Sequence, residues 1–139
     1  MNHPVLRFAA IMNLLKSFFS MFSPADSGGR RIEPLAAAQL VRENKAVLVD
    51  VREPAEWSGG VAENAALLPL SDLTGARRLW KPFLDRVGNR EIILYCRSGA
   101  RSGAVARILA AEGFQAANAG SLHAWHRAGL PVRPPHGAR

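Results

Sequence analysis

The segment at residues 91–95 reads Glu-Ile-Ile-Leu-Tyr and constrains the fold more than any other part of the chain. Branched and aromatic side chains of this kind favour a β-strand. An apolar run without strict alternation is typical of a strand that is covered on both faces of a parallel sheet. A second such run, at residues 46–49, ends at Asp50. Because parallel strands require long crossovers, the two runs predict helices in the intervening chain.

Helical patterns occupy the chain around these strands. Pro34 can open a first helix at its N-terminal turn. A second helical stretch begins at Ser71 and is ended by Gly-Asn at residues 88–89, with Pro82 expected to kink or split it. A third covers residues 102–112. The apolar positions predicted to face the core from the first and third helices are Leu35, Ala38, Val41, Val105, Ile108 and Leu109.

Two further strands are predicted at residues 66–68 and 114–118. Strands that alternate with helices at this spacing predict an α/β fold, in which a mostly parallel central sheet carries helices on both faces. Ligands of such sheets lie beyond the carboxyl ends of the strands. Two of these ends are Asp50 and Cys96, so functional residues are expected there.

The composition indicates one globular domain and argues against a nucleic-acid partner. A chain of 139 residues can bury a core without disulfides or metals, and the 48% apolar content is ordinary for such a domain. The net charge of +7 comes from short, scattered groups of bases without interleaved aromatic residues. No nucleic-acid binding is therefore expected, and the excess charge is interpreted as solvated surface and attraction for a small anion.

No metal or organic cofactor is expected either. A single cysteine excludes an internal disulfide and a cysteine-rich zinc site. Of the four histidines, His3 and His136 lie in the tails, while His123 and His126 flank Trp125. These last two histidines are interpreted as packing or surface residues rather than as ligands.

The N-terminal part of the chain differs from the rest. Residues 1–30 are predicted to form an amphipathic segment and a linker, residues 31–133 the domain, and residues 134–139 a tail. The apolar side chains of residues 4–22 fall on one helical face, but polar interruptions make this segment a poor membrane span. We expect a cytoplasmic protein with peripheral membrane contact through this segment. Packing on its own domain or on a second subunit remains open, as does a periplasmic protein with a signal peptide.

The loop from Cys96 to Ser102 carries the strongest chemical signal. It reads Cys-Arg-Ser-Gly-Ala-Arg-Ser between a strand and a helix, where unpaired backbone N–H groups and the helix dipole converge. Gly99 allows the backbone to curl around a ligand. A thiolate is stabilised in such a setting, so Cys96 is predicted to be a nucleophile rather than a buried apolar residue. Arg97 and Arg101 can hold an oxyanion, and Arg101 is expected to contribute more.

The length of this loop separates two chemistries. A cysteine-dependent phosphatase has five residues between its cysteine and its arginine, and Ser102 stands at the position that this spacing requires. Arg101 gives a shorter loop. The smaller cradle suits one sulfur atom attached to Cys96 better than a bound phosphate.

The chain resembles the rhodanese family over residues 32–132. The resemblance is carried by residues 48–57, by residues 94–102, and by residues 118–125 with 129–132. The family usually has Gly-His-Ile-x-Gly-Ala where this chain has Gly-Gly-Val-Ala-Glu-Asn-Ala-Ala at residues 59–66, without the histidine. The family's Gly-Gly before the last helix is Gly-Ser here.

This resemblance implies roles for individual residues. Cys96 is expected to carry sulfur as a persulfide, and Asp50 and Arg52 to support its loop from the neighbouring strand end. The other interpretation of Asp50 and Arg52 is a helix-capping carboxylate and a surface ion pair. The residues expected to cradle the persulfide are Arg97, Ser98, Gly99, Ala100, Arg101 and Ser102.

The implied reaction moves sulfane sulfur from an anionic donor such as thiosulfate to cyanide or a thiol. The resemblance implies a thiosulfate sulfurtransferase of the rhodanese type that needs no cofactor. The alternative is a non-catalytic module that delivers sulfur or docks within a protein complex.

Overall fold

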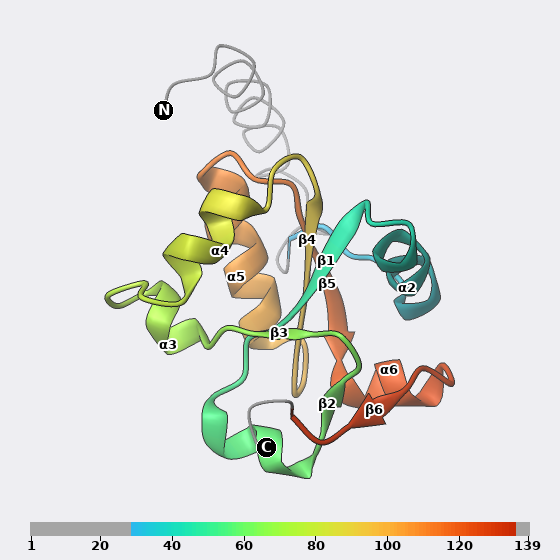
Figure 1. Ribbon diagram of the computed structural model, residues 1–139. Helices are drawn as coiled ribbons and strands as arrows, with labels where there is room; N and C mark the ends of the chain where they lie inside the picture. The colour runs from blue at the N-terminus through green and yellow to red at the C-terminus, as the bar shows by residue number, and fades with distance from the viewer. Residues whose placement is uncertain (1–28, 136–139) are drawn as a thin grey trace.

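The computed structural model describes residues 29–135 (Figure 1). The segment at residues 4–22, for which membrane contact is predicted, lies outside the described residues. The division of the chain at residues 30 and 133 therefore stays a prediction. None of the helices within residues 29–135 is both long enough and apolar enough to cross a bilayer.

A central sheet is built from β1 (Ala46–Asp50), β3 (Ala66–Leu67), β4 (Glu91–Cys96) and β5 (Ala116–Ser121). The strands lie in the order β3-β1-β4-β5, and each neighbouring pair is parallel. The predicted parallel sheet is thus confirmed. Asp50 pairs with Tyr95 and Cys96 pairs with Ser121, so the carboxyl ends of β1, β4 and β5 meet at one edge.

Helices cover both faces of this sheet, as predicted (Figure 1). On one side lie α3 (Leu70–Leu73), α4 (Trp80–Arg86) and α5 (Ala100–Ala111). On the other side lie α2 (Pro34–Arg42) and α6 (Leu122–Arg127). Successive residues of a strand point to opposite faces, so Cys96 packs with the α5 side while Tyr95 packs with the α2 and α6 side.

Two short elements extend the edge where the strands end. The 3-10 helix η2 (Pro54–Gly59) follows β1, and β2 (Val61–Ala62) pairs antiparallel with β6 (Val132–Arg133). Together with α6, they lie below the main sheet in Figure 1. They surround the carboxyl edge on which the candidate site is built.

The helix predicted between Ser71 and residue 87 is divided into α3 and α4, and the break lies before Pro82. The carboxylate of Asp72 accepts hydrogen bonds from the backbone N–H groups of Arg78, Leu79 and Trp80. Asp72 thereby satisfies amides at the start of α4, which a continuous helix would have used internally. Pro82 then falls in the first turn of α4, where it displaces no helical donor.

The prediction that Leu35 faces the core is wrong, because this side chain is 61% exposed. The buried residues of α2 are Ala37 and Ala38. Their small side chains let the helix lie against the sheet. Because the buried face of α2 is centred on these two alanines, Leu35 points toward solvent. Val41 is partly buried on this side, and in α5 the residues Val105 and Leu109 are fully buried.

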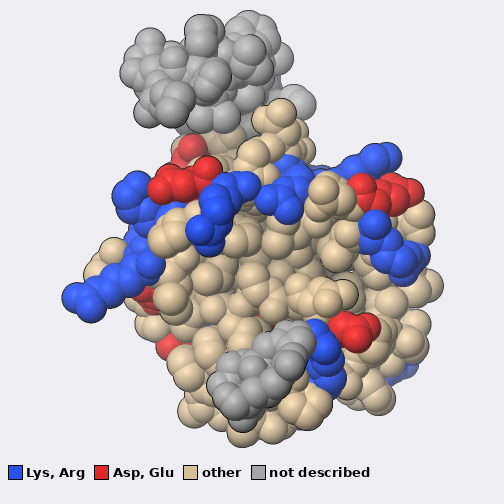
Figure 2. All heavy atoms as spheres, viewed as in Figure 1, with Lys and Arg blue, Asp and Glu red and all other residues tan. Residues whose placement is uncertain are grey.

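Charged side chains are distributed rather than concentrated on the face shown in Figure 2. Lys and Arg lie mainly around its rim, with Asp and Glu between them. Ion pairs such as Arg77 with Glu112 and Lys81 with Asp85 join groups of opposite sign. The interpretation of the excess charge as solvated surface stays a prediction.

Candidate active site around Cys96

The loop between β4 and α5 places a cysteine at the start of a helix. β4 ends at Cys96, and α5 begins at Ala100. Gly99 has a φ of 96°, in the left-handed region that glycine adopts without strain. A Cβ atom on Gly99 would lie 3.3 Å from the Cα of Gly120, so the close approach of β5 also favours glycine. The loop can therefore curl tightly over the end of the sheet.

Three donors of this loop surround the Cys96 sulfur. The Gly99 amide donates to Sγ at 3.0 Å, and the amide and hydroxyl of Ser102 each lie 3.4 Å from Sγ. Burial of the thiol raises its pKa, but the Ser102 hydroxyl and the amides of Ser102, Gly99 and Ser98 lower it. The pKa of Cys96 is lowered overall, because donors aimed at the sulfur favour its charged form.

Asn118 of β5 anchors this loop to the neighbouring strand. Its side-chain N–H donates to the Gly99 carbonyl at 2.9 Å, and its Oδ1 accepts from the Ser102 hydroxyl at 2.7 Å. The hydroxyl has a single proton, which it can give either to Asn118 or to Cys96. The amides of Gly99 and Ser102 donate to the sulfur whichever partner receives the hydroxyl proton.

Asp50 and Arg52 form a buried ion pair rather than a surface pair. The distance from Nη2 to Oδ2 is 2.8 Å, and their side chains are 0% and 8% exposed. Tyr95 donates its phenolic hydrogen to Asp50 at 2.6 Å and accepts a hydrogen bond from the Ala62 amide. Burial and the Asp50 charge raise the pKa of Tyr95, so the phenol stays protonated as a donor. Tyr95 pairs with Asp50 across the strands and directly precedes Cys96 in β4.

Arg52 connects the Asp50–Tyr95 network to η2, and η2 in turn contacts the cysteine loop through Glu56. Its guanidinium donates to the carbonyls of Glu56, in the middle of η2, and of Gly60, which directly follows η2. The Glu56 carboxylate then receives two hydrogen bonds from Arg101, at 2.7 and 2.8 Å. Asp50 and Arg52 thus reach the cysteine loop through Glu56, and contact with Cys96 is made by other residues.

The pair of Arg101 and Glu56 changes the expected role of Arg101. Hydrogen bonds from Arg101 and from the Glu53 amide lower the pKa of Glu56 to about 2. The carboxylate is therefore charged at neutral pH and occupies both terminal nitrogens of Arg101. Arg97 by contrast lies exposed at the entrance to the loop. The two arginines of the loop are not equivalent.

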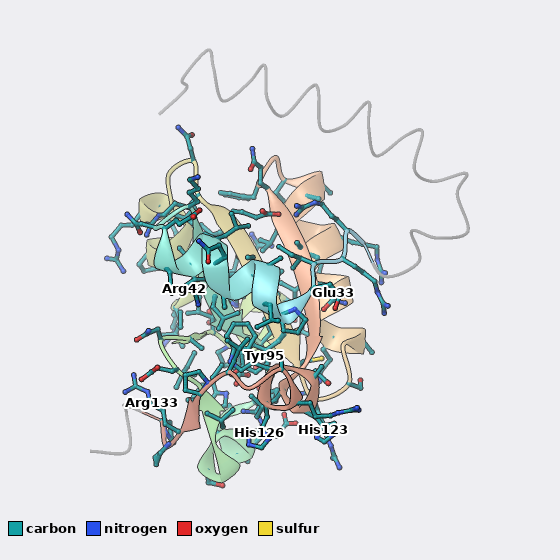
Figure 3. All side chains as sticks on the ribbon, turned by 90° about the vertical axis from the view of Figure 1, so that its right-hand side faces the viewer. Glu33, Arg42, Tyr95, His123, His126 and Arg133 are labelled. Carbon is teal, nitrogen blue, oxygen red and sulfur yellow. The ribbon has the colours of Figure 1, made fainter. Side chains whose placement is uncertain are left out.

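An open hollow of about 640 Å³ lies beside the loop. Arg52, Glu56 and Arg97 line one part of it, and His123 and His126 of α6 line another. Figure 3 shows the two labelled imidazoles on the same side of α6. The structure thus places both histidines, which were interpreted as packing or surface residues, at the edge of the candidate site.

Sequence reasoning missed Asn118, Glu56 and Tyr95. A signal for Asn118 was present, since an asparagine in an apolar strand must find partners when it is buried. Glu56 stands three residues after Glu53, at the spacing of a capping box, and this local role gives no indication of its contact with Arg101. Among residues 29–135, no group of three or more His, Cys, Asp or Glu side chains is placed to hold a metal ion.

A family model for the rhodanese-like domain matches residues 33–128. The chain therefore belongs to the rhodanese-like domain family.

Individual relatives agree with this assignment. A protein named sulfurtransferase from Allochromatium vinosum is 36% identical over 71% of this chain and 89% of its own length. The thiosulfate sulfurtransferase GlpE of Vibrio cholerae is 28% identical over 73% of this chain and 92% of its own. The uncharacterized protein slr1261 of Synechocystis is 36% identical over 73% of this chain, which spans only 54% of that protein.

The fold is shared with solved structures. A rhodanese-related protein from Thermoplasma volcanium superposes with a TM-score of 0.64 and 28% identity, over 76% of this chain and 99% of that one. The expected rhodanese-like fold is thus confirmed, and sulfurtransferases are found among the relatives.

Proposed function

We propose that this protein is a sulfurtransferase of the thiosulfate type, in which Cys96 carries the sulfur as a persulfide. The observation that carries the proposal is the convergence of the Gly99 and Ser102 amides on the Cys96 sulfur. Amides arranged in this way stabilise a thiolate before the reaction and a persulfide after it. The named activities of the Allochromatium and Vibrio relatives support the same chemistry.

In the first half-reaction, the Cys96 thiolate attacks the outer sulfur of thiosulfate. A bond forms between Cys96 Sγ and that sulfur, while the bond from that sulfur to the sulfonate breaks and its electron pair leaves with sulfite. Arg97 lies exposed at the loop entrance, where its guanidinium can neutralise the incoming anion. No oxidant or cofactor is consumed.

In the second half-reaction, cyanide or a thiolate attacks the outer sulfur of the persulfide. The bond to Cys96 breaks, and its electron pair returns to Sγ as a thiolate. Cyanide leaves as thiocyanate, and a thiol leaves as an organic persulfide. Covalent catalysis divides the transfer into two displacements, and the same amides stabilise the Cys96 leaving group in the second.

The alternative function is a non-catalytic module that delivers sulfur or docks in a complex. The experiment that separates the two is mass spectrometry of the purified protein after treatment with thiosulfate and then with cyanide. A catalyst gains one sulfur atom on Cys96 and loses it to cyanide, while the Cys96→Ser variant gains none. Absence of the added sulfur on the unaltered protein would contradict the proposal and favour docking.

A further inference from the structure

The hollow beside the cysteine loop lies at the same edge of the sheet as Cys96. Cys96 pairs with Ser121 across β4 and β5, and α6 begins at the next residue, Leu122. The Ser121 hydroxyl accepts a hydrogen bond from the Ala124 amide and so fixes the start of α6. His123 therefore stands two positions along the chain from the strand neighbour of the nucleophile. A ligand in the hollow would lie beside the loop entrance.

Two of the charged side chains around the hollow are already paired within the protein and are not available to a ligand. Arg52 is neutralised by Asp50, and Glu56 is neutralised by Arg101. The remaining polar groups along the wall are Arg97, His123 and His126, and all three are exposed. An imidazole presents at least one N–H donor in either charge state. The hollow thus offers one guanidinium and two imidazoles to an anion.

The size and the apolar part of the lining indicate an organic ligand. Leu122 and Val132 contribute carbon surface to the same wall. A volume of about 640 Å³ falls in the range of roughly 300–1,000 Å³ that is typical of sites for organic molecules. Cyanide needs neither this space nor the apolar surface, and thiosulfate is a compact ion that carries no carbon.

We propose that this hollow binds the acceptor, and that the acceptor is a thiol bearing a carboxylate. The carboxylate is held by Arg97, His123 and His126, and its carbon chain lies against Leu122 and Val132. The inference rests on the proposed function, because the thiol must meet a persulfide. The thiolate attacks the outer sulfur, the bond to Cys96 breaks, and its electron pair returns to Cys96.

The kinetic test compares two thiol acceptors of similar size with thiosulfate as the donor. They are 3-mercaptopropionate, which carries a carboxylate, and 2-mercaptoethanol, which carries a hydroxyl. We expect the unaltered protein to prefer 3-mercaptopropionate in kcat/KM for its thiolate form. In the double variant His123→Ala/His126→Ala, this preference should fall by about threefold to tenfold, since charge-assisted hydrogen bonds are lost at a solvent-accessible site.

The matched control is Arg127→Ala, which removes a positive charge from α6 at an exposed position outside the hollow lining. The preference should stay within about twofold of that of the unaltered protein. An equal fall in the control and in the double histidine variant would overturn the inference, because general surface charge would then explain it. A turnover without any preference for the carboxylate would overturn it as well, while leaving the sulfurtransferase proposal intact.

A second measurement tests the hollow without sulfur transfer. The ring signals of His123 and His126 are followed by NMR during titration with 3-(methylthio)propionate, and separately with the neutral 2-(methylthio)ethanol. We expect saturable shifts with the carboxylate and smaller shifts with the alcohol. Equal responses to both compounds, or none to either, would refute the carboxylate subsite even if no persulfide forms on Cys96.

Discussion

The Asn118 side chain bridges Gly99, in the middle of the cysteine loop, and Ser102, at its end, since it donates to the Gly99 carbonyl and accepts from the Ser102 hydroxyl. Gly99 and Ser102 are also the residues whose amides meet the Cys96 sulfur. Asn118 is buried, with 2% of its surface exposed. Its contacts therefore couple the position of β5 to the stabilisation of the Cys96 thiolate.

Asn118→Ala should raise the pKa of Cys96 toward that of an ordinary thiol, because the loop loses both anchors to β5. The pH midpoint of alkylation by iodoacetamide measures this change. Asn89→Ala, at an exposed turn, serves as the control and should leave the midpoint unchanged. An unshifted midpoint in a folded Asn118→Ala protein would show that the loop holds its shape without this anchor.

The contact of Arg101 with Glu56 favours an order of the two loop arginines opposite to the one predicted from the sequence. Because Arg101 is neutralised by Glu56, the exposed Arg97 should contribute more to thiosulfate binding. We expect Arg97→Ala to raise the KM for thiosulfate by about threefold to tenfold, and Arg101→Ala by about twofold or less. Glu56→Gln should lower the KM, since it releases the Arg101 charge. Steady-state kinetics with cyanide as acceptor measure all three, and a larger effect of Arg101→Ala would restore the expectation from sequence.

The same pair should make the stability of the protein depend on acid. The pKa of Glu56 is lowered from 4.5 to about 2 in the folded protein. A lowered folded pKa contributes stability above the unfolded pKa, and this contribution is lost as pH falls from about 4.5 through about 2. After allowance for solvent screening of this partly exposed pair, it is worth about 1–2 kcal/mol.

Urea unfolding at pH 7 and at a series of acidic pH values measures this dependence. Glu56→Gln should lower the free energy of unfolding at pH 7 and flatten its decline in acid. Glu112→Gln is the matched comparison: Arg77 also lowers the pKa of Glu112, so this variant should flatten the decline in acid through an ion pair away from the site. Identical acid profiles for Glu56→Gln and the unaltered protein would mean that the pair adds no stability.

The buried Tyr95 hydroxyl should be important for stability rather than for thiolate formation. Tyr95→Phe leaves the Ala62 amide without its acceptor and removes one donor to Asp50. A buried group left unsatisfied costs about 1–3 kcal/mol, which urea unfolding can resolve. Ser58→Ala removes a hydroxyl at the surface and should cost much less. A loss below about 0.5 kcal/mol in Tyr95→Phe would show that water replaces the hydroxyl.

The sequence predicted the parts of this site that are local in the chain. The strand into Cys96, the glycine turn and the start of α5 are neighbours in sequence, and their composition indicates a loop rich in amide donors. Contacts between distant segments could not be predicted from composition. Arg101 and Glu56 are separated by 45 positions and meet because the fold brings η2 next to the start of α5. Exposure of Leu35 likewise depends on how closely α2 approaches the sheet.

The length of the cysteine loop can be tested by inserting one alanine after Ala100. Each residue turns an α-helix by ~100°, so the insertion rotates the amide and hydroxyl of Ser102 away from Cys96 while the Gly99 amide keeps its place. We expect the pKa of Cys96 to rise and persulfide formation from thiosulfate to fall by at least about tenfold, since a principal amide donor is lost. Five residues would then separate the cysteine from the arginine, and arsenate should become an inhibitor.

Rapid-quench mass spectrometry measures persulfide formation, and competition with arsenate measures the inhibition. An alanine inserted after Gly88, in an exposed turn, is the control for insertion itself and should retain the rate. Full sulfur transfer by the Ala100 insertion variant would refute the argument that loop size selects sulfur over phosphate.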